Sequence, residues 1–394
     1  MPAPIRLDLF HVALPLRKSI RHASHERAAS DSLVSRVTLD DGSIGFGEGV
    51  PRSYVTGETI ETAIEALTAL DVAAQLGNPR DFAEAVGRIA DLRVPSIDDD
   101  PRGMFGNAAR AALEIALVDA YGHAFGESAG RAIRLASRVP ELLTPTAAWV
   151  RYSGAITAET PGKEIRSAGK MWLNNFRDVK LKVGVAGQDD AKRLRRIRAV
   201  LGRKIDVRLD ANEAWSPGEV VERVAALRPS RPSTIEQPVP HAQVESLAEM
   251  RPRLGVPVML DESLCGFPDA VRAVETGTAD LFNVRISKCG GLIPSLRLIE
   301  LAANHGIGVQ LGCHPGESGL LSAAGRHLAS NVRGLRYVEG SYDRHILERN
   351  VTCDDPTFGF GGWAKPIEGP GLGVRVDPEA LDAMTVSRRE IRYD

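Results

Sequence analysis

The feature that most constrains the fold is a long run of short apolar segments, from about residue 145 to 350, that alternate with amphipathic ones. The apolar segments have the length of buried β-strands, and the stretches between them carry apolar residues at helical spacing. Eight strand–helix units of this kind are what closes a parallel βα barrel. The predicted strands are 147–152, 178–183, 205–210, 234–237, 258–261, 281–287, 308–312 and 335–340.

The residues before this alternation have a different character. Polar and apolar residues alternate in two segments that we predict to be strands, 5–10 and 33–39. Three helical patterns follow, at about 58–75, 80–92 and 104–125. The N-terminal region therefore has the content of an α+β domain.

The C-terminal tail is rich in Gly and Pro, and we expect it to return to the N-terminal region. The predicted fold class is thus α/β, a modified TIM (βα) barrel with an α+β capping domain formed by the N-terminal region and the tail. The expected divisions are 1–126 for the capping domain, 140–350 for the barrel and 351–394 for the tail.

Composition and charge exclude several classes of protein. The chain is 43% hydrophobic and 25% charged, and 49 basic residues nearly balance 51 acidic ones, so nothing favours nucleic acid or a membrane surface as a partner. No apolar run has the length of a membrane span, and the polar N-terminus does not resemble a secretory signal. Four cysteines do not make a disulfide framework. We expect a cytoplasmic protein.

Charged residues occur at the ends of successive predicted strands, where the active sites of βα barrels are assembled. Their separations are 28, 26, 25 and 27 residues, about one strand–helix unit each. Side chains spaced in this way converge at one mouth of the barrel although they are dispersed in the sequence. They are Lys182, Asp210, Glu236, Asp261 and Lys288.

The three carboxylates in this series, Asp210, Glu236 and Asp261, would repel one another if they converged without a counter-ion. Three carboxylate ligands with no Cys or His nearby suit a hard divalent cation. We therefore predict a Mg²⁺ site, with Mn²⁺ as the alternative ion. The competing interpretation is a set of three solvated loop acids.

Two lysines on the second predicted strand, Lys180 and Lys182, are separated by one residue, so strand alternation places both on one face. A neighbouring cation, a bound metal and partial burial all disfavour protonation, which can turn one lysine into a base. The alternative is a solvated pair on an edge strand. Lys288 approaches from the opposite side of the ring. By strand alternation it falls on the face of Val284 rather than on that of Arg285, so the alternative for Lys288 is a structural cation.

Together these motifs resemble those of the enolase superfamily, and within it the muconate lactonizing enzyme subgroup. The resemblance covers nearly the whole chain. The motifs are Lys180-Leu181-Lys182, Asp210-Ala211-Asn212-Glu213, Glu236-Gln237-Pro238, Asp261-Glu262-Ser263 and Lys288-Cys289-Gly290-Gly291-Leu292.

The resemblance implies a Mg²⁺-dependent isomerase that removes the α-proton of a small carboxylate substrate to give a metal-stabilised enolate. It implies that Lys182 is the base, Lys180 its electrostatic helper and Lys288 the acid/base on the opposite face. Asn212 and Glu262 are expected to support the metal ligands. A homo-oligomer is implied as well.

Lysines on both faces permit racemisation or epimerisation of an amino-acid derivative or dipeptide, which we favour over muconate-type cycloisomerisation. The main alternative is a lyase of the o-succinylbenzoate synthase or acid-sugar dehydratase type, which works by syn β-elimination. A barrel that forms Schiff bases through a lysine and a barrel retained only for binding are further alternatives.

Substrate contacts are expected from the capping-domain loops and from the ends of the seventh and eighth strands. Dipeptide epimerases of the subgroup usually carry Asp-x-Asp after the eighth strand. This chain has Glu339-Gly340-Ser341-Tyr342-Asp343 instead, which weakens a dipeptide assignment. The expected substrate contacts are His22, His314, Glu317, Glu339 and Asp343. For His314 and Glu317, the alternative is a role confined to the loop.

Overall fold

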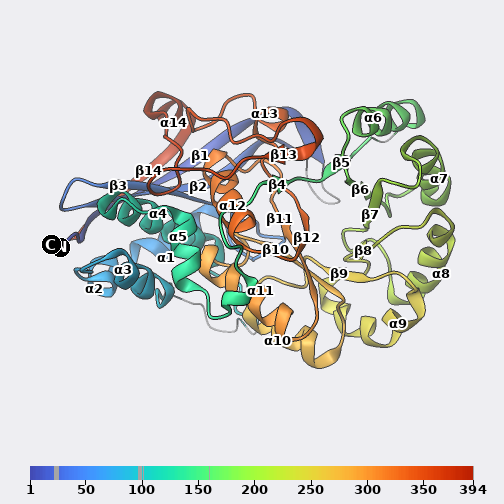
Figure 1. Cartoon of the computed structure of the whole chain (residues 1–394), viewed down its shortest axis with the longest axis horizontal. Helices are drawn as coiled ribbons and strands as arrows, with labels where there is room; N and C mark the ends of the chain where they lie inside the picture. Colours follow the sequence, from blue (N-terminus) through green and yellow to red (C-terminus); the bar gives the residue numbers. More distant parts are fainter. Residues whose placement is uncertain (22–25, 96–99, 101, 159, 394) are drawn as a thin grey trace.

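The computed structural model describes residues 1–21, 26–95, 100, 102–158 and 160–393. A sheet with its helices and a ring of parallel strands lie side by side (Figure 1). Among the helices of these described ranges, none is both long enough and apolar enough to cross a membrane.

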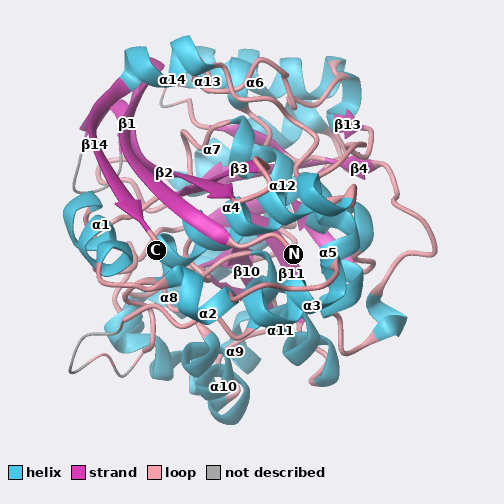
Figure 2. Cartoon of the chain, turned by 90° about the vertical axis from the view of Figure 1, so that its left-hand side faces the viewer, coloured by secondary structure: helices cyan, strands magenta, loops and turns pink. Residues whose placement is uncertain are grey.

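Four antiparallel strands in the order β14-β1-β2-β3 form the sheet of the capping domain. The last strand of the chain pairs with the first, with Leu9 opposite Arg389, and Figure 2 shows the two side by side. The predicted capping domain, built from the N-terminal region and the returning tail, is confirmed. Its strands are β1 (Pro4–Arg21), β2 (Glu26–Leu39), β3 (Ile44–Gly49) and β14 (Thr385–Arg392).

Helices follow this sheet along the chain. The helix predicted at about 58–75 is divided in two, because Asp71 starts a new helix by accepting a hydrogen bond from the Ala74 N–H at 2.9 Å. The helices are α1 (Ile60–Thr68), α2 (Val72–Leu76), α3 (Phe82–Ala90), α4 (Asn107–Phe125) and α5 (Ala129–Ala136).

Helix α4 lies directly on strand β3 because small residues face one another. The strand carries Gly45, Gly47 and Gly49 at alternate positions, and a Cβ atom on any of them would overlap the backbone of α4. The helix meets these glycines with alanines such as Ala112 and Ala116. A larger side chain at any of these glycines would push α4 away from the sheet.

Eight parallel strands form the barrel in sequence order, from β5 to β12. The first and last strands meet where the Ser153 N–H donates a hydrogen bond to the Val338 oxygen at 2.8 Å. The predicted eightfold alternation is confirmed. The strands are β5 (Gly154–Ile156), β6 (Asp178–Lys182), β7 (Asp206–Asp210), β8 (Ile235–Glu236), β9 (Val258–Leu260), β10 (Leu281–Arg285), β11 (Gly308–Gly312) and β12 (Leu335–Val338).

Helices connect the barrel strands and lie on the outside of the ring (Figure 1). The last two helices, α13 and α14, belong to the chain that leaves the barrel and returns to the capping sheet. The helices are α6 (Pro161–Leu173), α7 (Asp190–Leu201), α8 (Pro217–Leu227), α9 (Leu247–Leu254), α10 (Phe267–Thr276), α11 (Leu292–Asn304), α12 (Gly319–Asn331), α13 (Asp343–Ile346) and α14 (Pro378–Met384).

The first barrel strand begins later than predicted. The sequence predicts this strand at 147–152, but β5 starts at Gly154. Val150–Arg151 instead forms strand β4, which pairs antiparallel with β13 (Trp363–Ala364) of the tail. The apolar pattern there belongs to the seam between barrel and tail.

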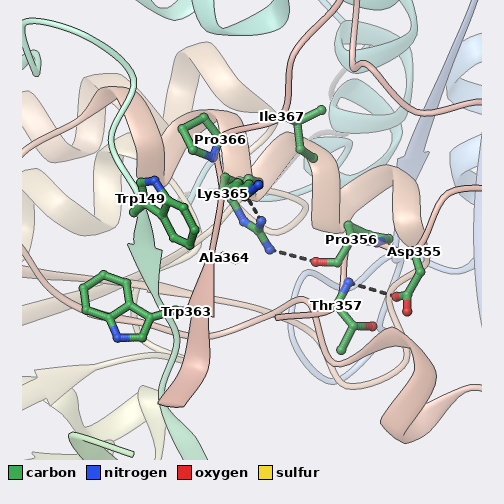
Figure 3. A pocket seen from close by; sticks show the side chains of 10 residues that line it. Trp149, Asp355, Pro356, Thr357, Trp363, Ala364, Lys365, Pro366 and Ile367 are labelled. Atoms are coloured by element: carbon green, nitrogen blue, oxygen red, sulfur yellow. Dashed lines mark hydrogen bonds between the residues drawn. The ribbon is translucent and has the colours of Figure 1, made fainter. Parts of the chain in front are cut away.

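A cavity of about 400 Å³ opens beside this seam (Figure 3). Trp149 and Trp363 lie on one side of it, and Asp355 and Thr357 of the tail lie on the other. None of the charged residues that end the described barrel strands lines this cavity.

Candidate active site

The charged residues that end successive barrel strands share one rim of the barrel. Lys182 is the last residue of β6, Asp210 of β7 and Glu236 of β8. Asp261 directly follows β9, and Arg285 is the last residue of β10. The parallel register places Lys182 opposite Asp210, and Asp210 opposite Glu236. Residues far apart in the sequence therefore meet at one mouth.

Lys180 lies among three carboxylates. Its Nζ is 2.9 Å from Glu339 Oε2, 3.4 Å from Asp210 Oδ2 and 3.5 Å from Glu236 Oε2. Burial lowers the pKa of this ammonium, but the three carboxylates outweigh burial and leave its pKa raised. For Glu339 the directions are reversed: burial raises its pKa, but the positive charges of Lys180 and Arg208 outweigh burial and lower the pKa to about 2. These groups form a charge network inside the barrel.

Glu236 is fully buried at the end of β8. The side-chain amide of Asn283 on β10 donates a hydrogen bond to Glu236 Oε1 at 2.8 Å. Burial raises the pKa of Glu236, and the negative charge of Asp210 raises it further. A cation placed between these two carboxylates would offset both effects.

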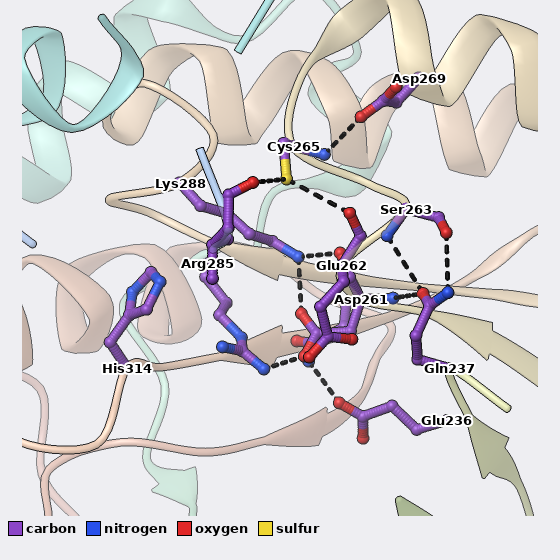
Figure 4. Close-up of polar contacts among 12 residues, drawn as sticks. Glu236, Gln237, Asp261, Glu262, Ser263, Cys265, Asp269, Arg285, Lys288 and His314 are labelled. Carbon is purple, nitrogen blue, oxygen red and sulfur yellow. Dashed lines mark hydrogen bonds and ion pairs between the residues drawn. The ribbon is translucent and has the colours of Figure 1, made fainter. Parts of the chain in front are cut away.

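Asp261 is held by two cations that come from the end of β10 and the turn after it (Figure 4). Lys288 Nζ lies 2.6 Å from Asp261 Oδ1 and 2.5 Å from the Asp261 main-chain oxygen. The Arg285 guanidinium donates to Asp261 Oδ2. From the other side, Gln237 Oε1 accepts hydrogen bonds from the N–H groups of Asp261 and Ser263 at 3.0 and 3.1 Å.

The donor chemistry of Asp210, Glu236 and Asp261 fits a divalent cation. All three are buried, with at most 1% of their surface exposed, and carboxylate oxygens are the ligands that Mg²⁺ prefers. Within the described part of the chain, no three His, Cys, Asp or Glu side chains are gathered closely enough to hold a metal ion. The contacts above instead pair each carboxylate with an ammonium, amide or guanidinium group, and a bound cation would exchange with them.

Lys182 shares a face of β6 with Lys180, because Leu181 between them is buried on the opposite face. Both lysine residues are partly exposed. The Lys182 main-chain oxygen accepts a hydrogen bond from the Arg193 guanidinium of α7 at 3.1 Å. This contact fixes the strand end from which the Lys182 side chain extends.

The two residues predicted to support the ligands, Asn212 and Glu262, contact each other. The Asn212 N–H donates to Asp210 Oδ1 at 3.1 Å, and its side-chain amide donates to Glu262 Oε1 at 3.3 Å. Asn212 has a φ of 41°, in the left-handed region that Asn tolerates better than most residues. Burial, followed by the charge of Asp210, raises the pKa of Glu262 to about 7.

Three of the residues predicted to contact substrate, His314, Glu317 and Asp343, line a small cavity past the ends of β11 and β12. The His314 N–H donates to Glu317 Oε1 at 2.5 Å. Asp343 accepts hydrogen bonds from Ser322 Oγ at 2.7 Å and Asn350 Nδ2 at 3.0 Å. Burial raises the pKa of Glu317 to about 8 and that of Asp343 to about 6. The cavity wall therefore carries acids that hold their protons unusually well.

The two other predicted substrate residues do not line that cavity. Glu339 lies in the charge network of the barrel interior, where Arg208 Nη1 is 3.0 Å from Glu339 Oε1. His22 lies outside the described residues.

Gln237, Asn283 and Arg285 have no predicted role, but Asn283 and Arg285 contact carboxylates of the mouth and Gln237 contacts the main chain of Asp261. Asn283 and Arg285 occupy alternate positions of β10, so strand alternation alone was a signal for placing them on the inner face. Gln237 has a φ of 36°, and its side-chain amide donates to Val239 O at 2.8 Å and Ser263 Oγ at 2.7 Å. No sequence pattern indicates this conformation.

The chain is similar to proteins of known activity and fold. Residues 163–380 match the family model described as Enolase C-terminal domain-like. Hydrophobic dipeptide epimerase of Enterococcus faecalis is 27% identical, over 89% of this chain and 88% of that protein. Muconate cycloisomerase 1 of Rhodococcus opacus is 28% identical, over 94% and 95%.

Among solved structures, the dipeptide epimerase of Cytophaga hutchinsonii complexed with Mg and the dipeptide D-Ala-L-Val matches with a TM-score of 0.81. The two sequences are 23% identical, and the match covers 99% of this chain and 100% of that one. The likeness in fold extends over both the capping domain and the barrel.

Proposed function

The chain belongs to the Enolase C-terminal domain-like family, and from this membership we propose that it is an isomerase of the enolase superfamily. The proposed reaction begins with removal of the α-proton of a small carboxylate substrate by Lys182. Similar proteins include an epimerase and a cycloisomerase, and an α-proton transfer of this kind is a step that both reactions can use.

The observation that carries the proposal is the arrangement of charge around the mouth. Three buried carboxylates, from the ends of β7, β8 and β9, stand between the lysines of β6 and the cations that follow from β10. An α-proton beside a carboxylate is too weakly acidic for an amine unless the charge that develops is neutralised by groups already in place. A mouth that gathers cations and metal-type ligands meets that requirement.

We propose that Asp210, Glu236 and Asp261 hold Mg²⁺, with Mn²⁺ as the alternative ion. When bound, the ion supplies positive charge beside the substrate carboxylate. Asn212 positions Asp210 through its N–H, and it also holds Glu262.

The two lysines of β6 have different tasks in this proposal. Lys182 ends the strand and its amine accepts the α-proton. Lys180 lies two residues earlier on the same strand, among three carboxylates. It acts as a fixed positive charge. His314 and Glu317 contact the distal part of the substrate from the cavity past β11.

The test is proton NMR in D₂O with Mg²⁺, applied to pools of dipeptides, N-acylated amino acids and unsaturated diacids. Loss of α-proton signals, abolished by EDTA and restored by added Mg²⁺, is the expected result. Exchange that survives chelation contradicts the metal assignment, and no exchange in any pool contradicts the proposed substrate class.

The base is tested in the same assay with Lys182→Ala, which should slow exchange by about 10²- to 10⁴-fold. Lys192→Ala is the matched control, because Lys192 is exposed on the outer helix α7. A Lys182→Ala protein that exchanges as fast as the control would overturn the role of Lys182.

A further inference from the structure

We propose that Arg285, and not Lys288, faces Lys182 across the barrel mouth, so that this site transfers protons on one face of the substrate only. The inference rests on the proposed function and deepens it. It replaces the predicted acid/base role of Lys288, and it favours one-base isomerisation, such as cycloisomerisation, over epimerisation.

The strand order places Arg285 opposite Lys182. Strands β6 and β10 are four steps apart in the series of eight, and the hydrogen bond from Ser153 to Val338 joins the two ends of that series. The two strands therefore occupy opposite sides of the ring. Lys182 ends β6 and Arg285 ends β10, with the three carboxylates on the strands between them.

The parity of β10 directs Arg285 into the mouth. Asn283, two residues earlier on the same face, donates a hydrogen bond to Glu236 at 2.8 Å, which identifies that face as the inner one. The Arg285 guanidinium accordingly reaches Asp261 (Figure 4). Its side chain is 11% exposed, so Arg285 is not fully enclosed.

Lys288 is enclosed behind Asp261. Its side chain is 0% exposed, and its ammonium donates both to the carboxylate and to the main-chain oxygen of Asp261. Asn107 at the start of α4 donates to the Lys288 main-chain oxygen at 3.0 Å. Lys288 therefore joins the end of β9 to the capping domain, and its ammonium lies away from the open space where a substrate is accessible.

An arginine and a lysine differ in what they can do at this position. A guanidinium offers five N–H donors and no acceptor, so it binds and stabilises negative charge. A lysine amine can take a proton from carbon and later return it. Inversion at the α-carbon needs such a group on each face, and of the two cations that follow from β10 it is Arg285, a donor without a basic nitrogen, that faces Lys182.

The steps balance with one base. The amine of Lys182 takes the α-proton, and the electrons of the C–H bond pass into the substrate carboxylate. If the ammonium returns the proton, it does so to the same face, and the configuration is retained. If a carboxylate oxygen of the same molecule is bonded to the next carbon, that C–O bond breaks, the electron pair leaves with the oxygen, and the product is an unsaturated diacid.

The stereochemical test uses single L-enantiomers of the dipeptides and N-acylated amino acids that exchange in the NMR assay. In D₂O the protein should incorporate deuterium while chiral chromatography finds the L-form, with inversion at least about 100-fold slower than exchange. Arg285→Lys restores a base on the second face and should raise the ratio of inversion to exchange at least 10-fold. Inversion by the unchanged protein at a rate close to exchange would overturn the proposal.

A second measurement needs no turnover. The Mg²⁺-loaded protein is treated with acetic anhydride, and mass spectrometry maps which lysines are modified. Lys182 and the exposed control Lys192 should react, and Lys288 should stay unmodified until the protein unfolds. If Lys288 were modified as fast as Lys182, the ammonium of Lys288 would not be enclosed, and the proposal would be overturned. Because labelling is independent of substrate, a failure to exchange any substrate contradicts the proposed function and leaves the placement of Arg285 and Lys288 to be decided by this result.

Discussion

Buried carboxylates occur in two parts of this molecule, and most of their hydrogen-bond partners differ between the two. The mouth carboxylates mainly contact side-chain ammonium, guanidinium or amide groups. A second set, which we call the helix-end carboxylates, contacts backbone N–H groups in the first turns of helices. The mouth carboxylates are Asp210, Glu236 and Asp261, and the helix-end carboxylates are Glu48, Glu58 and Glu114.

Glu48 on β3 shows the second arrangement most fully. It accepts hydrogen bonds from the Ser318 N–H at 3.0 Å and the Leu321 N–H at 3.3 Å, at the start of α12. The hydroxyl groups of Ser318 and Ser32 donate to it at 2.6 and 2.8 Å. One capping-domain side chain therefore holds the N-terminus of a barrel helix.

Glu58 and Glu114 act in the same way on other helices. Glu58 accepts from the N–H groups of Ala108 and Ala109, in the first turn of α4, at 2.9 and 3.2 Å. Glu114 on α4 accepts from the Ile293 N–H of α11 at 2.9 Å, and it also accepts from the Arg110 guanidinium. Negative charge at a helix N-terminus is stabilised by the unpaired N–H groups and by the helix dipole.

The difference separates carboxylates that stabilise the fold from carboxylates that we assign to binding and catalysis. A backbone N–H group is fixed in place by its helix, so Glu48 and Glu114 join the capping domain to barrel helices, while Glu58 holds the start of α4 within the capping domain. Ammonium and guanidinium groups stand on rotatable side chains and can yield to a metal ion or a substrate. We therefore expect substitutions in the first set to change stability and substitutions in the second set to change binding and turnover.

The largest effect is expected at the mouth. Glu236→Gln removes a charged ligand and should weaken Mg²⁺ binding by about 100-fold or more, as measured by isothermal titration calorimetry. Without metal, its unfolding temperature should equal or exceed that of the parent, because a buried charge beside Asp210 is gone. Unchanged Mg²⁺ affinity would remove Glu236 from the proposed ligand set.

At the joint between the two regions, Glu48→Ala should lower the free energy of unfolding by about 3 kcal/mol, because it leaves the N–H groups of Ser318 and Leu321 unpaired. Urea unfolding measures this loss, with the exposed Glu65→Ala as control, expected within about 0.5 kcal/mol of the parent. A loss no larger than that of the control would mean that Glu48 does not hold α12.

The pH dependence of stability sharpens the comparison at Glu58. Burial raises the pKa of Glu58 to about 7, against the effect of the α4 N–H groups. The folded chain then binds this proton more tightly than the unfolded chain, so the free energy of unfolding falls as the pH rises from about 4.5 to about 7. Glu58→Gln removes this contribution, and its stability relative to the parent should rise by on the order of 2 kcal/mol across that range. Parallel pH profiles for the two proteins would contradict the raised pKa.

The smallest effect is expected at Thr59, the neighbour of Glu58. Its hydroxyl accepts a hydrogen bond from the Thr62 N–H at 3.2 Å and caps the exposed start of α1. Thr59→Ala should cost about 1 kcal/mol, with the same value between pH 5 and 8, because the acid beside it, Glu61, has a pKa lowered by its own N–H and by Thr59 and stays ionised over that range. A pH-dependent loss in urea unfolding would show that Thr59 and Glu58 are not independent caps.

Much of the barrel mouth could be predicted, because the sequence patterns that indicate it lie within short segments. Apolar segments of strand length recur with the period of a βα unit, and Lys182, Asp210 and Glu236 each end a strand whose boundaries follow from its own residues. The prediction of a barrel strand at 147–152 is wrong, because that segment pairs with the tail strand β13 and not with the barrel.

The sequence by itself determined the barrel, the capping domain and the identity of the strand-end residues, since strand periodicity and side-chain chemistry are properties of short segments. Only the tertiary structure decided which partner each charge has. Glu48 meets Ser318 across 270 residues, and Asp261 meets both Arg285, whose side chain is 11% exposed, and Lys288, whose side chain is 0% exposed. A charge takes its role from the distance and burial of its partners, and these are set when the whole chain has closed the ring and brought the capping sheet against it.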